Sequence, residues 1–272
     1  MGNALAERLV AAKHDVWGLR RRPAHLPEGV NRIEADLAVG ASLRDLPGAL
    51  DKVVYCAGPG GPDDAHYRTA YVEGLSRLVE ALEQQAQRPQ RIIFVSSTSV
   101  FAQTNGAWVD ESSATEPRAH GGLRLLEAED VLRHAPFPGT VVRFAGIYGP
   151  RRTRLLERVR ASQAVYQAGP PRYTNRIHRD DCAGVLHHLL DLEAPEDLYL
   201  GVDSEPAEEL EVMKWLAGSL GAHPPRPAHG DERKRGRGSN KRCRNQRLLD
   251  SGYAFQYPSF REGYMGLIRE LS

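Results

Sequence analysis

The sequence predicts an α/β protein built on a doubly wound parallel sheet, with a smaller mixed part at its C-terminal end. Strand and helix signals alternate over residues 1–150, which is the pattern of βαβ units joined by right-handed crossovers. The apolar runs at 53–57 and 92–95 are continuous rather than alternating, which is typical of strands buried on both faces. After Pro150 the pattern loosens, so we expect one domain over residues 1–150 and a capping part over residues 151–272.

Each element follows from a local pattern of apolar residues. The segment 65–85 shows the clearest stripe, with apolar or aromatic residues at positions 67, 71, 75, 78 and 82. Helices are expected at 4–12, 65–85, 123–134, 155–161, 179–192, 208–220 and 260–271. Strands are expected at 15–19, 32–35, 52–57, 92–95, 140–144 and 197–202. Prolines, glycines and basic residues over 221–246 predict an exposed loop, and helix 179–192 is expected to pack back on the first domain.

Composition and charge exclude several classes of protein. The 272 residues include 36 lysines and arginines against 35 acidic residues, so no net field would recruit nucleic acid or a membrane surface. No run approaches the roughly 20 apolar residues of a membrane span. The three cysteines, Cys56, Cys182 and Cys243, are odd in number and widely spaced, which indicates reduced thiols and a cytoplasmic protein.

A run of hydroxyl residues, Ser96 to Ser99, directly follows the strand at 92–95. In open α/β sheets, reactive groups lie just past the carboxyl ends of the strands. The position therefore suits a reactive hydroxyl, although a serine-rich turn that hydrogen-bonds its own backbone explains the same residues. The motifs elsewhere in the chain favour the functional interpretation.

Five segments occur in an order that resembles the extended short-chain dehydrogenase/reductase superfamily, also called the NAD(P)-dependent epimerase/dehydratase family. They are D-L at 36–37, V-V-Y-C-A-G at 53–58, F-V-S-S-T-S-V-F at 94–101, V-R-F-A-G-I-Y-G-P at 142–150 and N-R-I-H-R-D-D at 175–181. The resemblance implies a Rossmann-type dinucleotide-binding domain over residues 1–150 and a substrate domain after it. It also implies a catalytic hydroxyl at Ser97 and cofactor contacts from Asp36, Leu37, Ala57, Gly58 and Ser96.

The chain departs from the family at its start. The family's glycine-rich loop carries three glycines between its first strand and first helix, and only Gly2 matches, at the last of them. That loop and the helix N-terminus bind the cofactor's pyrophosphate. We therefore expect the first strand, which is central in the sheet, to be missing from this sequence, with a gap or a substitute strand beside Val16. We also expect Met1 to be an internal position of a longer natural product.

A second departure concerns the proton relay. In the family's Tyr-x-x-x-Lys pair the tyrosine transfers a proton and the lysine lowers its pKa; the two positions correspond to Gly121 and Leu125 here. Leu125 lies on an apolar stripe, so packing explains it. Tyr71 stands at the family's helix asparagine and is expected in the core or an interface. His120, beside the vacant tyrosine position, could act as acid or base, but simple exposure also explains a loop histidine.

Basic residues suggest which cofactor is bound. Arg20 and Arg21 follow the strand at 15–19, where an acidic residue would contact the ribose 2′-hydroxyl of NAD, so arginine there favours NADP over NAD. A solvated basic turn is the alternative. A second basic run, at 233–247, is expected in a solvated loop. Capture of a phosphorylated substrate is the second interpretation. Nucleic-acid binding is the third, because stacking residues are lacking. His187 and His188 lack a matching carboxylate or cysteine, so no metal site is expected.

Two functions remain open. The first is an NADP-linked oxidoreductase or epimerase-like enzyme with an atypical active site, acting on a small sugar or nucleotide-linked substrate. The second is a non-catalytic cofactor-binding sensor or partner-binding protein that has lost the proton relay, which the missing tyrosine and lysine favour. A homodimer through helices 65–85 and 123–134 is compatible with either function.

Overall fold

The computed structural model describes residues 1–229 and 240–270, and the chain divides into two compact units. The first unit contains residues 1–100, 116–143 and 183–199, and the second contains residues 101–115, 144–182 and 200–272. Residues 101–115 of the expected first domain thus group with the second unit. The later part of the helix expected at 179–192 groups with the first unit.

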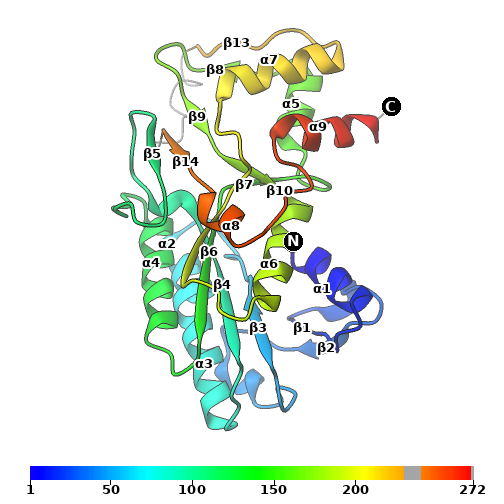
Figure 1. Cartoon of the computed structure of the whole chain (residues 1–272), viewed down its shortest axis with the longest axis vertical. Helices are drawn as coiled ribbons and strands as arrows, with labels where there is room; N and C mark the ends of the chain where they lie inside the picture. The colour runs from blue at the N-terminus through cyan, green and yellow to red at the C-terminus, as the bar shows by residue number, and fades with distance from the viewer. Residues whose placement is uncertain (230–239, 271–272) are drawn as a thin grey trace. The chain divides into compact units, whose positions relative to one another are not determined.

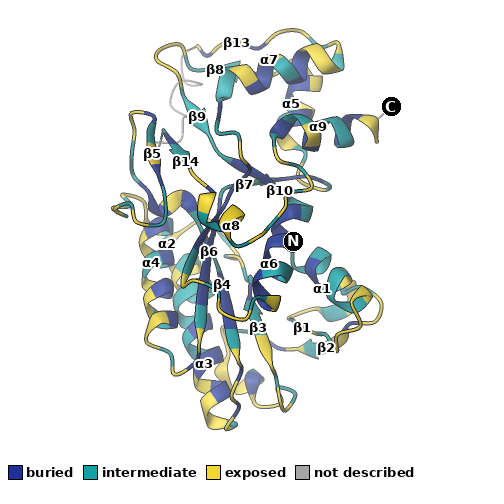
Figure 2. Ribbon diagram, in the orientation of Figure 1, coloured by how far each residue is buried: buried dark blue, intermediate teal, exposed yellow. Residues whose placement is uncertain are grey.

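The main sheet has four strands in the order β11-β6-β4-β3. Their bounds are Lys52–Tyr55 for β3, Arg91–Ser97 for β4, Gly139–Phe144 for β6 and Leu198–Gly201 for β11. β3 and β4 are parallel, with Lys52 opposite Arg91 and Tyr55 opposite Phe94. The side chains of the apolar run at 92–94 are completely buried (Figure 2), as expected for a strand covered on both faces.

Strands β1 (Trp17–Arg20) and β2 (Asn31–Glu34) form a separate parallel sheet of two strands, with Leu19 opposite Ile33. Within residues 1–229 and 240–270, no strand lies between β1 and β3, and each of these two strands pairs on one edge only. The division falls where the sequence predicted a gap beside Val16 (Figure 1). The Rossmann-type order of strands is otherwise preserved.

Helices cover both faces of the main sheet. The predicted helix 65–85 consists of α2 (Asp64–Tyr67), a π-helical segment (Arg68–Glu73) and α3 (Gly74–Gln84). Figure 1 shows α3 and α4 (His120–Arg133) side by side on one face, whereas α1 (Gly2–Ala11) and α6 (Arg179–Asp191) lie toward the other. Doubly wound α/β sheets have this arrangement, so the predicted fold class is confirmed.

Within the described residues, the second unit is built from short paired strands and helices. Its strands are β5 (Ala107–Val109) with β14 (Lys241–Cys243), β7 (Gly146–Tyr148) with β10 (Arg176–His178), β8 (Val165–Tyr166) with β13 (Arg226–Pro227), and β9 (Tyr173–Thr174) with β12 (Ala207–Glu208). Its helices are α5 (Arg154–Arg160), α7 (Glu209–Leu220), α8 (Gln246–Asp250) and α9 (Phe260–Arg269). Leu156, Leu216 and Phe260 are fully buried in its core.

The prediction of one exposed loop over 221–246 is wrong for β14, which is a largely buried strand, whereas β13 is a strand of two exposed residues. Lys241 is 5 % exposed, and its ammonium group donates to the carbonyl of Phe101 at 3.3 Å. The guanidinium group of Arg242 lies 4.8 Å from the centre of the Trp108 ring. The aliphatic parts of lysine and arginine side chains bury apolar surface in this way. A prediction based on charge alone does not take this burial into account. The basic residues at 233, 234, 235 and 237 lie outside the described residues.

None of the helices formed by the described residues is both long and apolar enough to span a membrane. This agrees with the absence of long apolar runs in the sequence.

Candidate functional site

The carboxyl end of β4 presents a hydroxyl group that is free to donate. Ser97 ends β4 and is half-buried. Its Oγ accepts the backbone N–H of Ser99 at 3.1 Å, which fixes the oxygen. Within the described part of the chain, no acceptor takes the hydroxyl hydrogen of Ser97. The group can therefore donate a hydrogen bond to an oxygen of a bound molecule.

Ser96 points to the opposite face of β4, because successive strand residues alternate. Its hydroxyl donates to Oε1 of Glu129 at 2.6 Å, and Glu129 accepts two further hydrogen bonds from Arg143, at 2.9 and 2.6 Å. All three residues are buried. The side chain of Ser96 is thus part of an internal polar network, and a cofactor contact from this residue would have to come from its backbone.

The ring of Tyr67 borders Gly121, the position expected to correspond to the family's tyrosine. Gly121 lies in the first turn of α4, and a Cβ atom there would come within 2.8 Å of Cε1 of Tyr67. A Cβ on Gly122 would lie 3.0 Å from the carbonyl oxygen of Ser99, so this turn packs against the residues that follow Ser97. The sequence assigned Tyr67 to a core stripe, but the residue borders the candidate site and is only half-buried.

His120 and Arg124, the neighbour of Leu125, each contact a residue of the segment 62–67. Nε2 of His120 lies 3.0 Å from the carbonyl of Pro62, to which it donates, and the histidine ring meets Tyr67 edge-on at 5.1 Å. Leu125 is 3 % exposed, which confirms that it is a packing residue. The adjacent Arg124 is bound by both oxygens of Asp64, at 2.8 Å each.

Tyr71 packs rather than reacts. Its ring meets those of Tyr67 and Phe94 at centroid distances of 5.7 and 6.3 Å. Burial raises the pKa of Tyr71, and the neighbouring Tyr67 adds to the rise. Tyr71 is half-buried among these rings, as expected for a packing residue.

The residues predicted to bind the cofactor's phosphates converge at the start of α1. A Cβ on Gly2 would lie 3.2 Å from Sγ of Cys56, at the end of β3. Burial raises the pKa of the Cys56 thiol, and the charge of Arg20 partly offsets that rise, so this positive charge is close to it. The first turn of α1 has no acidic residue and no side-chain cap. Free N–H groups and positive charge at this position fit an anionic phosphate group.

The residues expected around the adenosine half lie at the ends of β1, β2 and β3. Arg20 and Arg21 are exposed, and neither has an ion-pair partner in the portion that the structure describes. The carboxylate of Asp36 accepts the N–H of Ala38 at 2.9 Å, which holds the turn after β2. Leu37 packs partly into a small core cluster. A Cβ on Gly58 would meet nothing within 4 Å, so the backbone there is open to a ligand.

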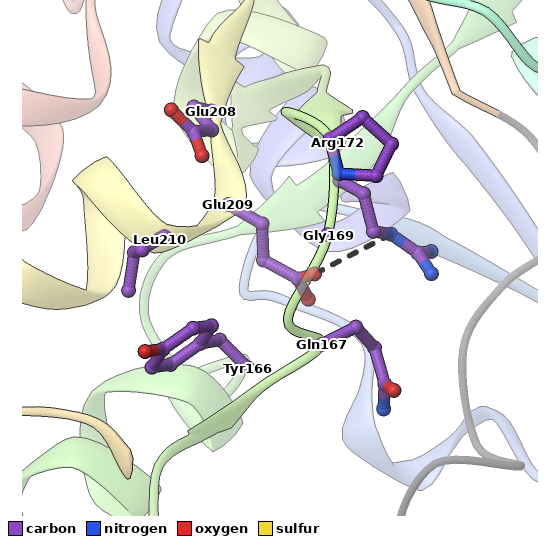
Figure 3. Close-up of a pocket in the computed structure, with 8 residues that line it drawn as sticks. Tyr166, Gln167, Gly169, Arg172, Glu208, Glu209 and Leu210 are labelled. Atoms are coloured by element: carbon purple, nitrogen blue, oxygen red, sulfur yellow. Dashed lines mark ion pairs between the residues drawn. The ribbon is translucent and has the colours of Figure 1, made fainter. Parts of the chain in front are cut away.

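A pocket in the second unit contains none of the predicted site residues. Figure 3 shows Tyr166, Gln167, Arg172 and Glu209 around it. The guanidinium of Arg172 lies 3.8 Å from a carboxylate oxygen of Glu209, so its charge is already balanced there. The pocket is remote in sequence from Ser97, and we assign it no role in the chemistry.

This geometry defines a class, namely a Rossmann-type protein with a serine at the carboxyl end of a central strand. Residues 1–198 match the NAD dependent epimerase/dehydratase family. The chain belongs to that family, as its five motifs implied.

Two curated relatives cover most of the chain. A 3-diazoavenalumate denitrifying reductase of a Streptomyces species is 28% identical over 246 residues, which are 83% of this chain and 80% of the relative. Protein YeeZ of Escherichia coli K12 is 29% identical over 205 residues, which are 73% of this chain and 68% of that protein.

Solved structures share the fold along nearly the whole chain. A protein of Methylobacillus flagellatus assigned as an NAD-dependent epimerase/dehydratase is 35% identical, with a TM-score of 0.79 and coverage of 99% of this chain and 94% of that one. The human epimerase family protein SDR39U1, solved with NADPH, is 20% identical, with a TM-score of 0.79 and coverage of 96% and 93%. MoeE5 with UDP-glucuronic acid and NAD is 22% identical, with a TM-score of 0.80 and coverage of 100% and 96%.

Proposed function

We propose that the protein is a nicotinamide-dependent reductase that prefers NADP and acts on a small electrophilic substrate. The observation that carries this proposal is the hydroxyl group of Ser97, which is held by the N–H of Ser99 and keeps its own hydrogen free. In this position the hydroxyl would polarise an oxygen of the substrate and stabilise negative charge that develops on it. The dinucleotide, when bound, would supply the hydride.

The cofactor preference is based on charge at the ends of the first strands. The N-terminal turn of α1 would receive the pyrophosphate, and Arg20 or Arg21 would pair with a 2′-phosphate. A relative in Streptomyces is a reductase, and the human neighbour was solved with NADPH. Both observations support reduction with NADPH, whereas MoeE5 was solved with NAD.

The missing proton relay narrows the class of substrate. Reduction of a carbonyl group consumes a proton as well as a hydride, and the family's tyrosine normally serves that step. Gly121 and Leu125 cannot do so. Replacement of dinitrogen by hydride in an aryl diazonium ion consumes no proton, and the Streptomyces relative is named for a diazo substrate. We therefore favour substrates that accept hydride without a proton donor.

The second candidate function is a cofactor-binding sensor without turnover. The specific observation in its favour is that Tyr67 covers Gly121, so that the family's tyrosine is replaced by a packing contact. A sensor would bind the dinucleotide and transmit its occupancy to a partner. An epimerase would need the proton relay at two steps, and the site supports it less well.

Binding and turnover separate these functions. NADPH and NADH would be titrated first, by calorimetry, and NADPH oxidation would then be followed at the nicotinamide absorbance with aryl diazonium ions, aldehydes and UDP-sugars. A reductase predicts turnover with at least one acceptor and loss of that turnover in Ser97→Ala. Tight cofactor binding without turnover of any acceptor would reject the reductase in favour of the sensor.

The vacancy at Gly121 allows a gain-of-function prediction. Gly121→Tyr alone should fail, because its Cβ would come within 2.8 Å of the Tyr67 ring. The triple variant Gly121→Tyr, Leu125→Lys, Tyr67→Ala clears that space and restores the pair, so carbonyl reduction should rise by about 10²–10⁴-fold. The variant Tyr67→Ala with Leu125→Lys is the matched control and should show no gain. An unchanged carbonyl rate in a folded triple variant would contradict this account of the vacancy.

A further inference from the structure

The three residues His14, His187 and Asp191 form a cluster that no part of the proposed function uses. One ligand atom from each lies within 4.8 Å of the other two. Nε2 of His187 is 3.3 Å from Oδ2 of Asp191, and the rings of His14 and His187 meet edge-on at 6.1 Å. The geometry points to a divalent transition-metal site, which we assign to zinc, on the first unit. Among the residues that the structure describes, no other group of three such ligands comes together.

The sequence did not reveal this site, because its ligands come from distant segments. His187 and Asp191 lie four positions apart on α6, so they share one helix face. His14 comes from the turn after α1, 173 positions earlier than His187. The expectation that His187 lacks a matching carboxylate is therefore wrong, since Asp191 supplies one.

The ligand chemistry favours zinc. Imidazole nitrogens and a carboxylate oxygen are common zinc ligands at distances of about 2.0–2.2 Å. Ligands at the corners of a tetrahedron of that size lie about 3.3–3.5 Å apart. The ligand atoms of His187 and Asp191 already have this separation. A side-chain rotation of the exposed His14 can bring its ring nitrogen to a similar distance from both. The fourth position would hold water.

The backbone around the cluster is held in place. The N–H of His14 donates to the carbonyl of Leu9 at 3.0 Å, which fixes the turn after α1. The guanidinium of Arg91 donates to the carbonyls of Leu189 and Leu192, at 2.6 and 2.7 Å, and so secures the end of α6. Ligands on a fixed backbone lose less entropy when they bind a metal.

The charge around Asp191 also favours a cation. Asp191 is the last residue of α6, where the helix dipole disfavours a negative side chain. Its Oδ1 lies 3.6 Å from the ammonium group of Lys52, and its Oδ2 faces His187. Lys52 therefore orients the carboxylate as outer partners of metal ligands do, and leaves Oδ2 for the metal. A bound zinc ion would tie the α1 turn to the end of α6.

The test is a metal titration of tag-free, chelator-treated full-length protein. We expect one equivalent of Zn²⁺ to bind in calorimetry, one equivalent of Co²⁺ to show the visible absorption of four-coordinate cobalt, and the melting temperature to rise with Zn²⁺. His14→Ala, His187→Ala and Asp191→Asn should each weaken binding by more than the roughly 10- to 100-fold that loss of an outer partner causes.

A matched control exists on α4. Asp130 and His134 are also a carboxylate and a histidine four positions apart, and Nδ1 of His134 lies 3.6 Å from Oδ2 of Asp130. Within the described residues this pair has no third ligand. His134→Ala should leave the zinc affinity unchanged. Absence of binding at micromolar zinc, or equal binding in folded His14→Ala and His187→Ala proteins, would overturn the assignment. Nicotinamide-linked activity has no part in these measurements.

Discussion

Ser97 and Ser99 differ in what their side chains do, although they lie two residues apart. Ser97→Ala removes the hydrogen-bond donor at the end of β4. With a carbonyl acceptor, kcat should fall by about 100-fold or more, as when one donor to a developing oxyanion is lost. The Kd of NADPH should change little, because the substitution leaves the phosphate and adenosine contacts intact. Steady-state kinetics and a binding titration measure the two effects separately.

Ser99→Ala is the control for this prediction. It keeps the backbone N–H that holds Ser97 and deletes only an exposed hydroxyl. Its kcat should equal that of the unaltered protein. Robust turnover in Ser97→Ala would remove Ser97 from the chemistry.

Arg20 tests the cofactor preference. A charge-assisted contact with the 2′-phosphate is worth roughly 1.5–3 kcal/mol, so Arg20→Ala should reduce the preference for NADPH over NADH by about tenfold or more. Lys13→Ala, at an exposed cation on the opposite end of α1, should leave the preference unchanged. Equal affinities for the two dinucleotides in the unaltered protein would show that the arginines are only a solvated turn.

At the scale of elements, the network of Ser96, Glu129 and Arg143 joins β4, α4 and β6. Glu129 is 2 % exposed and Arg143 is 5 % exposed. Glu129→Ala removes the carboxylate that pairs with the buried guanidinium group of Arg143, so the free energy of unfolding should fall by about 3–5 kcal/mol. Urea denaturation measures this loss.

An exposed ion pair on the same helix provides the comparison. Arg133 and Asp130 lie 2.7 Å apart, and their side chains are 66% and 58% exposed. Asp130→Ala should therefore cost about 1 kcal/mol or less. Equal losses in Glu129→Ala and Asp130→Ala would mean that burial does not govern the strength of these pairs.

Longer elements could be predicted from the sequence because their burial is periodic. The helix expected at 123–134 is α4, and the strand expected at 140–144 is β6, each within a few residues. The strand pairs of the second unit were missed because most have only two or three residues, too few to show a period. β14 also pairs with β5, which lies more than a hundred residues earlier in the chain. Its basic residues are not typical of a buried strand, so the sequence did not indicate one.

The residues of the candidate site that one sequence motif supplies could be predicted. The residues that come together from distant segments could not. Ser97 follows directly from its strand. The position of Tyr67 relative to the apolar stripe of the helix could not be predicted, because the π-helical segment that begins at Arg68 changes the helical period beyond it. His14 and Asp191 have no common signal in the chain at all.

At the scale of the whole molecule, one buried acid should make stability depend on pH. Burial raises the pKa of Asp203 to about 8, although Arg176 and the N–H of Glu205 oppose the rise. Its Oδ2 has no hydrogen-bond partner among the residues that the structure describes. Between pH values of about 4 and 8 the unfolded chain loses this proton and the folded chain keeps it. Stability should therefore decrease as the pH rises through this range.

Thermal melts at several pH values between 5 and 9 measure this dependence. Asp203→Asn should flatten the decrease and raise the melting temperature at pH 8, because the amide carries no charge to bury. Asp45→Asn, at an exposed carboxyl, should keep the original slope. A profile for Asp203→Asn that is as steep as that of the unaltered protein would mean that other groups cause the dependence.

The division of the sheet between β1 and β3 has a consequence for how molecules of this protein meet. An unpaired strand edge presents N–H and C=O groups that can pair with an extended segment of another chain. Val53 and Val54 of β3 are only partly buried, although their sequence suits the middle of a sheet. Among the described residues, the edges of β1 and β3 that have no partner could each accept a strand from another molecule, so self-association should grow with protein concentration.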